Sequence, residues 1–299
     1  MSFFSIITPT FNRLAQLPEL VNCVLGQYFD DFELIIVDDG STDGTDELIQ
    51  DLIVDPRIKY YRLKKNSGGP AHPRNYGIEK SEGDWISFLD ADDLWKANKL
   101  TETYTLIKKN PQVIVFCHDE IMLKRATGYR RHLRYGPFTK NFYQTMLIEG
   151  NKLSTSATTV KRDFLLSHNI KFNEDSNYTI VEDYDFWLQI AKREAKFYFH
   201  NKPLGYYVVD KYGISSDHQK SLNNLSHLLK SHVDSLDIPA SSKKIILNKI
   251  KYFSEFSSAI YSFKNKNYRI FLSELFFLLF RSPKLFSFYL LKKLLRVNL

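Results

Sequence analysis

The chain has 299 residues, 43% of them hydrophobic and 25% charged, so it can bury the core of one large domain or of a domain with an appendage. Two cysteines, Cys23 and Cys117, exclude a disulfide-rich secreted protein, and the first residues predict no signal peptide. The net charge of +7 is uneven: residues 211–299 carry 15 Lys and Arg against five Asp and Glu, whereas residues 1–210 carry 26 against 29. The basic character therefore indicates a partner for the C-terminal part.

Residues 1–100 alternate between apolar runs of strand length and helical stretches, with turn residues after the runs. Such alternation predicts a mostly parallel sheet that is covered by helices on both faces. Ligands of such sheets bind beyond the carboxyl ends of the strands. The predicted strands are residues 3–9, 32–40, 58–63 and 85–89, and the predicted helices are residues 14–27, 42–54 and 73–80.

The pattern is mixed between residues 101 and 205, where strands are predicted at 113–118 and 154–160 and a helix at 183–193. From residue 216 onward the pattern is helical, with no clear strand. The sequence therefore predicts an α/β domain over residues 1–215 and a helical region over residues 216–299.

Three carboxylates follow the apolar strand 85–89 directly, in Asp90-Ala91-Asp92-Asp93. Like charges at the end of a buried strand repel each other unless a cation offsets them. A few hard oxygen ligands suit Mn²⁺ or Mg²⁺ whose coordination is completed by substrate phosphates. The alternative is an acidic turn that caps the next helix, but such a turn does not need three carboxylates. The metal interpretation is therefore favoured.

A second acidic turn, Asp38-Asp39-Gly40, ends the strand 32–40. A carboxylate at this place can accept hydrogen bonds from a ribose hydroxyl or a base N–H. Asp-Gly is also a common turn, so this motif alone does not decide between a binding site and a turn.

The segment 66–77 contains Gly68 and Gly69, which let backbone N–H groups approach a ligand closely. Arg74 lies near a predicted helix start and can pair with phosphate oxygens. The segment is neither a P-loop nor a Gly-x-Gly-x-x-Gly motif, and an ordinary surface loop explains the glycines equally well.

A last acidic group, Glu182-Asp183-Tyr184-Asp185, comes just before an apolar helical stretch. It could supply a general base near the metal site. Spacing alone favours the simpler interpretation, in which acidic residues stabilise a helix N-terminus.

Five segments, taken together and in this order, resemble the family-2 glycosyltransferases of the GT-A fold. The resemblance covers about residues 3–210, and the ordered set is more specific than any single segment. It implies a Rossmann-like, mostly parallel sheet flanked by helices, a C-terminal helical extension and an enzyme of the bacterial surface-polysaccharide type. The matching segments are residues 5–13, 37–42, 66–77, 88–93 and 182–185.

The resemblance also implies a role for individual residues. Asp92 ligates the metal, and Asp183 is the catalytic base with Glu182 beside it, although Asp185 remains a rival base. Thr8, Pro9 and Asp39 line the pocket for the base and ribose. The residues implied to bind the donor are Thr8, Pro9, Asp38, Asp39, Asn66, Arg74, Asp90 and Ala91.

The implied reaction is the transfer, with inversion, of a hexose or N-acetylhexosamine from a nucleotide-diphosphate sugar, with UDP as the expected nucleotide. The expected acceptor is a saccharide, namely a lipid-linked glycan intermediate in cell-surface polysaccharide synthesis, and the expected cofactor is Mn²⁺ or Mg²⁺. Residues 1–100 would bind the nucleotide sugar, and residues 101–215 would form the acceptor side.

The sequence departs from many relatives in two places. They carry Tyr-Arg-x-His before a Ser-rich turn, whereas residues 207–216 here lack that Arg and His; Lys211 or His218 is a possible substitute. No Gln-x-x-Arg-Trp follows Asp185, which argues against a processive polysaccharide synthase.

The tail from residue 269 alternates short apolar runs with cations, and no run reaches the roughly 20 residues that span a bilayer. Aromatic and aliphatic residues interleaved with Lys and Arg suit helices that lie in a membrane interface. The alternative is that these helices pack on the catalytic domain or on a second subunit of an oligomer. We expect a cytoplasmic protein at the inner face of the cell membrane.

Two other functions compete with glycosyl transfer. A metal-dependent nucleotidyltransferase also uses paired carboxylates, but it needs a Gly-rich loop with a catalytic cation near the first strand, for which Asn12-Arg13 is a poor substitute. A non-catalytic nucleic-acid or lipid-binding protein would fit the basic tail, but no nucleic-acid-binding motif is found, so no nucleic-acid partner is expected.

Overall fold

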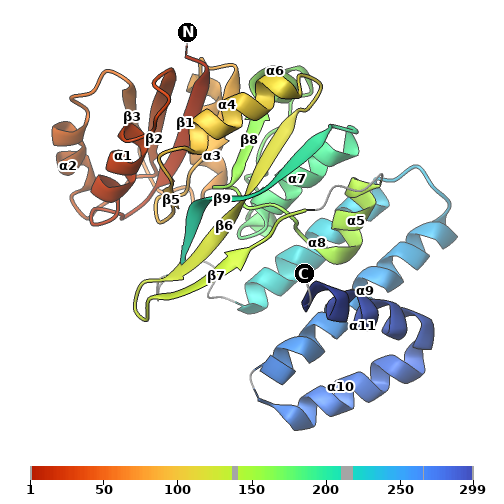
Figure 1. Ribbon diagram of the computed structural model, residues 1–299. Coiled ribbons are helices and arrows are strands. Elements are labelled where there is room, and N and C mark those ends of the chain that lie inside the picture. Colours follow the sequence, from red (N-terminus) through yellow and green to blue (C-terminus); the bar gives the residue numbers. More distant parts are fainter. Residues whose placement is uncertain (1, 137–140, 210–217, 265, 298–299) are drawn as a thin grey trace. The chain divides into compact units, whose positions relative to one another are not determined.

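The computed structural model describes residues 2–136, 141–209, 218–264 and 266–297 (Figure 1). The chain divides into two compact units, which we call the sheet unit (Met1–Tyr143 and Asn151–Leu228) and the helical unit (Gln144–Gly150 and Leu229–Leu299). The domain boundary predicted at residues 215 and 216 lies outside the described residues, so that division stays a prediction.

The helices and strands come from apolar runs and amphipathic stretches in the order that the sequence predicts, with additional elements after residue 90. The strands are β1 Phe4–Thr10, β2 Phe32–Asp38, β3 Ile58–Arg62, β4 Trp85–Phe88, β5 Leu94–Trp95, β6 Val115–Lys124, β7 Tyr129–Leu133, β8 Thr158–Lys161 and β9 Phe197–Val209. The helices are α1 Leu17–Leu25, α2 Thr45–Leu52, α3 Ala71–Lys80, α4 Lys99–Lys109, α5 Phe142–Glu149, α6 Arg162–Ser167, the 3₁₀ turn Ser176–Tyr178, α7 Glu182–Lys192, α8 His218–Asp234, α9 Ala240–Lys264, α10 Tyr268–Arg281 and α11 Pro283–Val297.

The sheet unit is built on one nine-stranded sheet with the strand order β3-β2-β1-β4-β8-β6-β9-β5, and β7 pairs with β6 (Figure 1). The strands β1 to β4 pair in parallel, as predicted. The second half mixes directions, because β8 runs antiparallel to β4 and β6, whereas β6 and β9 are parallel. The predicted α/β class, with a sheet flanked by helices, is confirmed.

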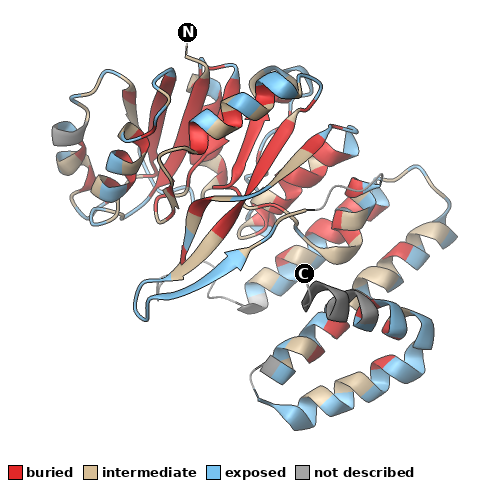
Figure 2. Cartoon of the chain, viewed as in Figure 1, coloured by how far each residue is buried: buried red, intermediate tan, exposed pale blue. Residues whose placement is uncertain are grey.

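The central strands β1 and β2 are buried along their whole length, as Figure 2 shows. Helices cover both of their faces, which is why these strands read as continuous apolar runs without alternation. Phe4 and Ile6 share one core cluster with the apolar face of α1 and with Leu100 of α4. On the opposite face, a Cβ atom at Gly77 of α3 would lie 2.4 Å from Ile7 Cγ2, so only glycine permits this approach of helix and strand.

Four aromatic side chains, which we call the aromatic cluster, fasten α7 to the sheet. The rings of Phe172 and Phe186 stack in parallel at 4.0 Å, and Phe88 of β4 meets both edge-on at 5.3 and 5.8 Å. Trp187 packs against Phe88 and Phe186. Because these rings are large and fully buried, they fix the N-terminus of α7 relative to the end of β4.

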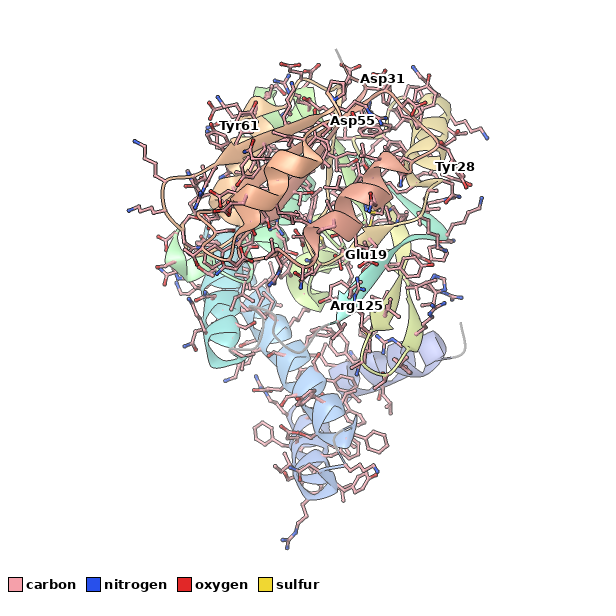
Figure 3. All side chains as sticks on the ribbon, turned by 90° about the vertical axis from the view of Figure 1, so that its left-hand side faces the viewer. Glu19, Tyr28, Asp31, Asp55, Tyr61 and Arg125 are labelled. Atoms are coloured by element: carbon pink, nitrogen blue, oxygen red, sulfur yellow. The ribbon has the colours of Figure 1, made fainter. Side chains whose placement is uncertain are left out.

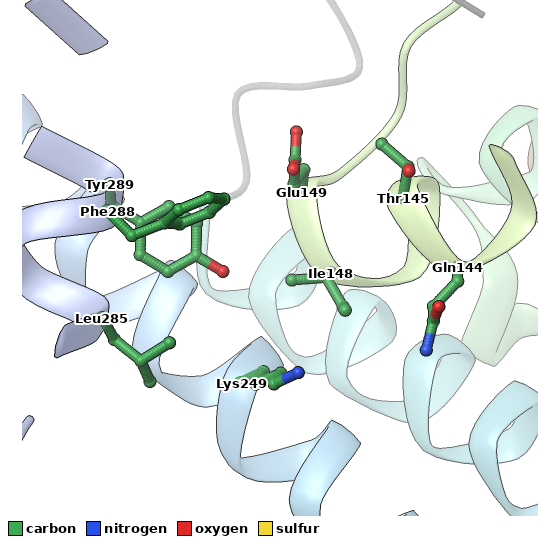
Figure 4. Close-up of a pocket in the computed structure, with 8 residues that line it drawn as sticks. All are labelled: Gln144, Thr145, Ile148, Glu149, Lys249, Leu285, Phe288 and Tyr289. Carbon is green, nitrogen blue, oxygen red and sulfur yellow. The ribbon is translucent and has the colours of Figure 1, made fainter. Parts of the chain in front are cut away.

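The helical unit has its own core, in which α9, α10 and α11 pack around Tyr252, Phe256 and neighbouring apolar residues. A pocket of about 320 Å³ lies within this unit (Figure 4). Among the described residues, no helix combines the length and apolarity that crossing a bilayer requires. The residues that line the pocket are Gln144, Thr145, Ile148, Glu149, Lys249, Leu285, Phe288 and Tyr289.

Candidate active site

The acidic motifs of the first hundred residues meet at one edge of the sheet. Thr10 pairs with Asp38 and Ile7 pairs with Phe88, so β1, β2 and β4 end side by side. The turn Asp90–Asp93, which we call the carboxylate turn, follows at this edge. The topology therefore brings together the residues that parallel strands were predicted to bring together.

Asp38 and Asp39 are neighbours with different surroundings. Asp38 is fully buried, and its carboxylate accepts hydrogen bonds from Ser41 N and Oγ and from Tyr60 Oη. Both of its carboxylate oxygens thus accept hydrogen bonds from protein groups, so Asp38 is suited to stabilising the turn that follows β2. The predicted contact of Asp38 with the donor stays a prediction.

Asp39 joins the end of β2 to the glycine-rich segment. Ser67 N donates to both of its oxygens at 3.0 Å, and Ser67 Oγ donates at 2.9 Å. Burial raises the pKa of Asp39, and the hydrogen bonds from Ser67 oppose that effect. Gly40 adopts φ +77°, and a Cβ atom there would lie 3.0 Å from Asn66 N, so glycine is required where the two segments meet.

Thr8 and Pro9 line the buried end of β1. Among the described residues, the hydroxyls of Thr8 and Thr10 have no hydrogen-bond partner. An unpaired buried hydroxyl costs free energy, which a bound ligand could recover.

Arg74 occupies the centre of the site, between two carboxylates. Its Nη2 atom lies 2.6 Å from Asp90 Oδ1, and its Nη1 atom lies 2.9 Å from Glu182 Oε1. Arg74 is only 3% exposed, and its guanidinium lies 5.2 Å from the ring centroid of Phe172. Although burial lowers it, the two carboxylates raise the pKa of Arg74. This geometry positions the carboxylate turn against α7, while direct contact of Arg74 with a donor stays a prediction.

Asp183 lies at the start of α7, beside this ion pair. Asn151 Nδ2 lies 3.2 Å from its Oδ2 atom and Thr155 Oγ1 lies 3.4 Å from it. Burial and the adjacent charge of Glu182 raise the pKa of Asp183 to about 7, against the opposing effect of Arg74. A carboxylate with such a pKa is suited to accept a proton near neutral pH.

Asp185, the rival base, is 4% exposed, and its Oδ2 atom accepts a hydrogen bond from Gln189 Nε2 at 2.6 Å. Asp183 is less buried and lies next to the Arg74 ion pair. The geometry therefore favours Asp183, and the assignment stays a prediction.

Besides Asp90, the carboxylate turn contains one buried and one accessible carboxylate. Asp93 is buried, and it accepts hydrogen bonds from Ser156 Oγ at 2.6 Å and Val208 N at 2.9 Å. Asp92 is 36% exposed at its side chain, and its Oδ2 atom lies 3.7 Å from Arg13 Nη2. Ala91 between them is buried, where a small side chain fits.

A metal ion would find a sparse set of protein ligands at this turn. Within the part of the chain that the structure describes, no three His, Cys, Asp or Glu side chains form a metal-binding group. Asp92 nevertheless fits a site in which one or two carboxylates hold Mn²⁺ or Mg²⁺ and substrate phosphates complete the coordination. Its side chain is accessible, which suits that arrangement, although it also forms an ion pair with Arg13.

Sequence patterns missed a buried acid on β6. Glu120 is fully buried and accepts a hydrogen bond from Tyr135 Oη at 2.7 Å. Burial, with smaller contributions from Asp90 and Asp119, raises the pKa of Glu120 to about 7. The only signal in the sequence is the polar run His118-Asp119-Glu120 after an apolar strand, which resembles the beginning of a loop.

The two residues expected to substitute for the missing Arg and His are not described: Lys211 and the side chain of His218 lie outside the described residues.

Comparison with known proteins identifies similar sequences. Residues 5–168 match the family model described as "Glycosyl transferase family 2". An uncharacterized glycosyltransferase of Haemophilus influenzae is 30% identical over 226 residues, which cover 74% of this chain and 85% of that protein. An uncharacterized glycosyltransferase of Rickettsia bellii is 34% identical over 190 residues, which cover 63% of this chain but 26% of the relative. Poly(ribitol-phosphate) beta-N-acetylglucosaminyltransferase TarS of Staphylococcus aureus is 26% identical over 89% of this chain and 46% of its own length.

Solved structures share the fold. TarS residues 1–349 in complex with UDP-GlcNAc superpose with a TM-score of 0.68 at 21% identity, covering 93% of this chain and 81% of that one. The mannosyltransferase PcManGT of Pyrobaculum calidifontis in complex with GDP-Man and Mn²⁺ gives a TM-score of 0.63 at 17% identity, covering 99% and 81%. At these identities the likeness is one of fold, and it confirms the predicted GT-A arrangement.

We expect Arg74→Met to destabilise the sheet unit by about 3–5 kcal/mol, because it leaves the buried Glu182 carboxylate without its counter-charge. The measurement is the free energy of unfolding in urea. Arg57→Met is the matched control, since Arg57 pairs with the more exposed Asp55 and Asp30, and its loss should cost less than about 1 kcal/mol. Adding Glu182→Gln to Arg74→Met should recover part of the loss. Equal costs for Arg74→Met and Arg57→Met would contradict the central role of Arg74.

Proposed function

This chain belongs to glycosyl transferase family 2, as its motifs indicated, and we propose that it transfers a hexose or N-acetylhexosamine from a UDP-linked sugar to a saccharide acceptor with inversion. Membership in this family identifies the chain as a glycosyltransferase and sets aside the nucleotidyltransferase alternative. Donor, acceptor and metal are proposals, since the chain spans about a quarter of the Rickettsia relative and about half of TarS.

The observation that carries this proposal is the double ion pair of Arg74 with Asp90 and Glu182. It connects the turn that follows β4 with the start of α7, where Asp183 lies. A glycosyltransferase needs these two parts close together, because the diphosphate leaves from one side of the sugar while the acceptor attacks from the other. No other described ion pair joins two of the acidic motifs that the sequence singles out.

In the proposed mechanism, Asp183 removes the proton from an acceptor hydroxyl as its oxygen attacks the anomeric carbon. The bond from that carbon to the diphosphate oxygen breaks on the opposite face, which inverts the configuration. Asn151 and Thr155 hold the Asp183 carboxylate by hydrogen bonds, and Glu182 remains bound to Arg74. Their contribution is to position the base before the acceptor arrives.

Asp92 would hold a divalent cation, either Mn²⁺ or Mg²⁺, and Asp90, which is paired with Arg74, would contact the donor. When bound, such an ion offsets the negative charge that develops on the leaving nucleoside diphosphate. On the donor side, Thr8, Pro9 and Asp39 would contact the nucleoside, and the unpaired Thr8 hydroxyl offers it a hydrogen-bonding group. The UDP donor is supported by the TarS structures with UDP and UDP-GlcNAc, and the metal by the Mn²⁺ complex of the mannosyltransferase.

We propose a lipid-linked glycan acceptor, with the helical unit at an anionic membrane surface on the cytoplasmic side. The support is that α10 exposes apolar side chains and turns a charged one toward its own unit. Leu272, Phe276 and Phe280 are 62%, 65% and 71% exposed. Glu274 instead accepts hydrogen bonds from the hydroxyls of Ser258 and Ser262. Exposed cations at residues 266, 269 and 284 flank this face. If two copies of the chain paired through this face, their cations would lie opposite each other and repel. An anionic bilayer is therefore favoured over self-association.

Wild-type protein with Mn²⁺ and a panel of sugar nucleotides should release nucleoside diphosphate, with the highest rate for a UDP sugar. Asp92→Asn should lower this release by about 100-fold or more, since the cation loses its protein ligand. Asp31→Asn, at an exposed position of the same unit, should leave the rate unchanged. Metal-dependent release at the wild-type rate from Asp92→Asn would disprove the metal assignment.

The pH dependence tests the base. Only the carboxylate form of Asp183 accepts a proton, and its pKa is raised to about 7, so kcat/KM should fall about tenfold per pH unit below pH 7 and level off above it. Asp183→Asn should remove activity at every pH. Asp185→Asn should keep the same ascending limb; if it is the inactive variant instead, Asp185 is the base.

Vesicle sedimentation tests the membrane surface. Wild-type protein should bind vesicles that contain phosphatidylglycerol, and Leu272→Ser/Phe276→Ser/Phe280→Ser should weaken binding more than about tenfold, since each apolar side chain contributes about 1.5–3 kcal/mol when fully buried. Tyr28→Ser/Val54→Ser/Leu166→Ser removes three exposed apolar side chains of the sheet unit and should bind normally. Equal binding by both variants would refute the assignment of α10.

A further inference from the structure

The hairpin of β6 and β7 carries an unusual concentration of positive charge. Residues 124–134, which we call the basic hairpin, contain five Lys and Arg and no Asp or Glu. The whole of residues 1–210 carries a net charge of −3. The basic hairpin is therefore a local reversal of sign on a slightly acidic part of the chain.

The hairpin geometry displays these cations along an exposed ribbon. β7 pairs antiparallel with β6, with Lys124 opposite Tyr129 and Met122 opposite Arg131, so Lys124, Tyr129 and Arg131 share one face. Arg130 lies on the other face, opposite Leu123. Among the described residues, β7 pairs with β6 alone, and residues 124–132 are exposed.

Three of the five cations lack an internal counter-charge. Arg125 forms an ion pair with Glu19 of α1 at 2.6 Å, and the two labelled side chains lie close together in Figure 3. Within the described ranges, no acidic side chain lies within 4.0 Å of the side-chain nitrogens of Lys124, Arg130 or Arg131. The pair with Glu19 anchors the hairpin tip, while three positive charges remain available to a partner.

The base of the hairpin leads to the active site. Glu120 lies on β6 at the base of the hairpin. Burial raises the pKa of Asp93 most, and the charge of Glu120 raises it further. Asp90 in turn raises the pKa of Glu120, so Glu120 lies close to the carboxylate turn. Arg131 lies opposite Met122, which is two residues along β6 from Glu120, and Lys124 is four residues along. At a rise of about 3.3 Å per residue, Arg131 lies about 7 Å and Lys124 about 13 Å from Glu120 along the ribbon. The cations therefore begin a short distance from the carboxylate turn and continue away from it.

We propose that the basic hairpin binds an anionic acceptor chain, a glycan or polyol polymer with repeated phosphate or carboxylate groups, and guides its end to Asp183. This inference rests on the proposed glycosyl transfer and adds the charge of the acceptor to it. Arg guanidinium groups pair with both phosphate and carboxylate oxygens, and spaced cations suit a chain with spaced anions.

The composition of the hairpin favours a dissolved or extended chain over a bilayer surface. Tyr129, 50% exposed, is the only large apolar side chain of residues 124–134 that is exposed to this degree. Binding in a membrane interface uses apolar side chains together with cations, and α10 has both. Charge without an apolar face is the pattern expected for a polyanion.

The test is binding of the full chain to two polymers, inorganic polyphosphate and polygalacturonate, at low and high ionic strength, with dextran as the neutral polymer. Lys124→Ala/Arg130→Ala/Arg131→Ala should weaken binding at least about tenfold at low salt, and salt should weaken wild-type binding. Lys109→Ala/Lys171→Ala/Lys196→Ala, three exposed lysines of the same unit, should bind like wild type. Arg130→Lys/Arg131→Lys should keep most of the binding, which separates charge from folding.

Preference for one polymer identifies the anion. The proposal is overturned if wild type binds neither polymer, if the control variant loses as much binding as the hairpin variant, or if the hairpin variant loses only its binding to phosphatidylglycerol vesicles. Release of nucleoside diphosphate to water, measured on the same variants, should be unchanged. Failure of that release in wild type would refute the proposed glycosyl transfer, whereas polymer binding needs no donor.

Discussion

The sheet unit depends on one buried guanidinium. Arg74 pairs with Asp90 after β4 and with Glu182 at the start of α7, two segments that lie far apart in the sequence. Without this cation, the carboxylates of residues 90, 182 and 183 would repel each other where little water can screen them, and they would either take up protons or separate. The same charge opposes the rise in the pKa of Asp183. The position of Asp183 and the pKa of its carboxyl group therefore both depend on the same guanidinium.

The first half of the sheet and its acidic edge could be predicted from sequence because the signals are local. Each strand is an apolar run that ends in a polar turn, and parallel pairing brings such ends together. The distinction between Asp38 and Asp39 could not be predicted in this way. Both follow β2 directly, and only the folded chain brings Tyr60 to one and Ser67 to the other.

The second half was harder because its signals are not local. The short strand β5 and the exposed strand β7 lack apolar runs, and β6 continues through His118, Asp119 and Glu120, which resemble the beginning of a loop. These polar residues are tolerated inside because of partners distant in sequence, such as Tyr135 for Glu120. For the same reason, spacing favoured a helix cap at Glu182 and Asp183, since the role of Arg74 between two motifs appears only in three dimensions.

The aromatic cluster beneath α7 bears on how such an enzyme can diverge. The family model ends at residue 168, so Phe88 lies inside the matched region, whereas Phe172, Phe186 and Asp183 lie beyond it. Buried rings that are closely packed keep their arrangement as long as their volume is preserved. Changes in the loops around these rings can therefore leave the start of α7, and with it Asp183, in the same place relative to the end of β4.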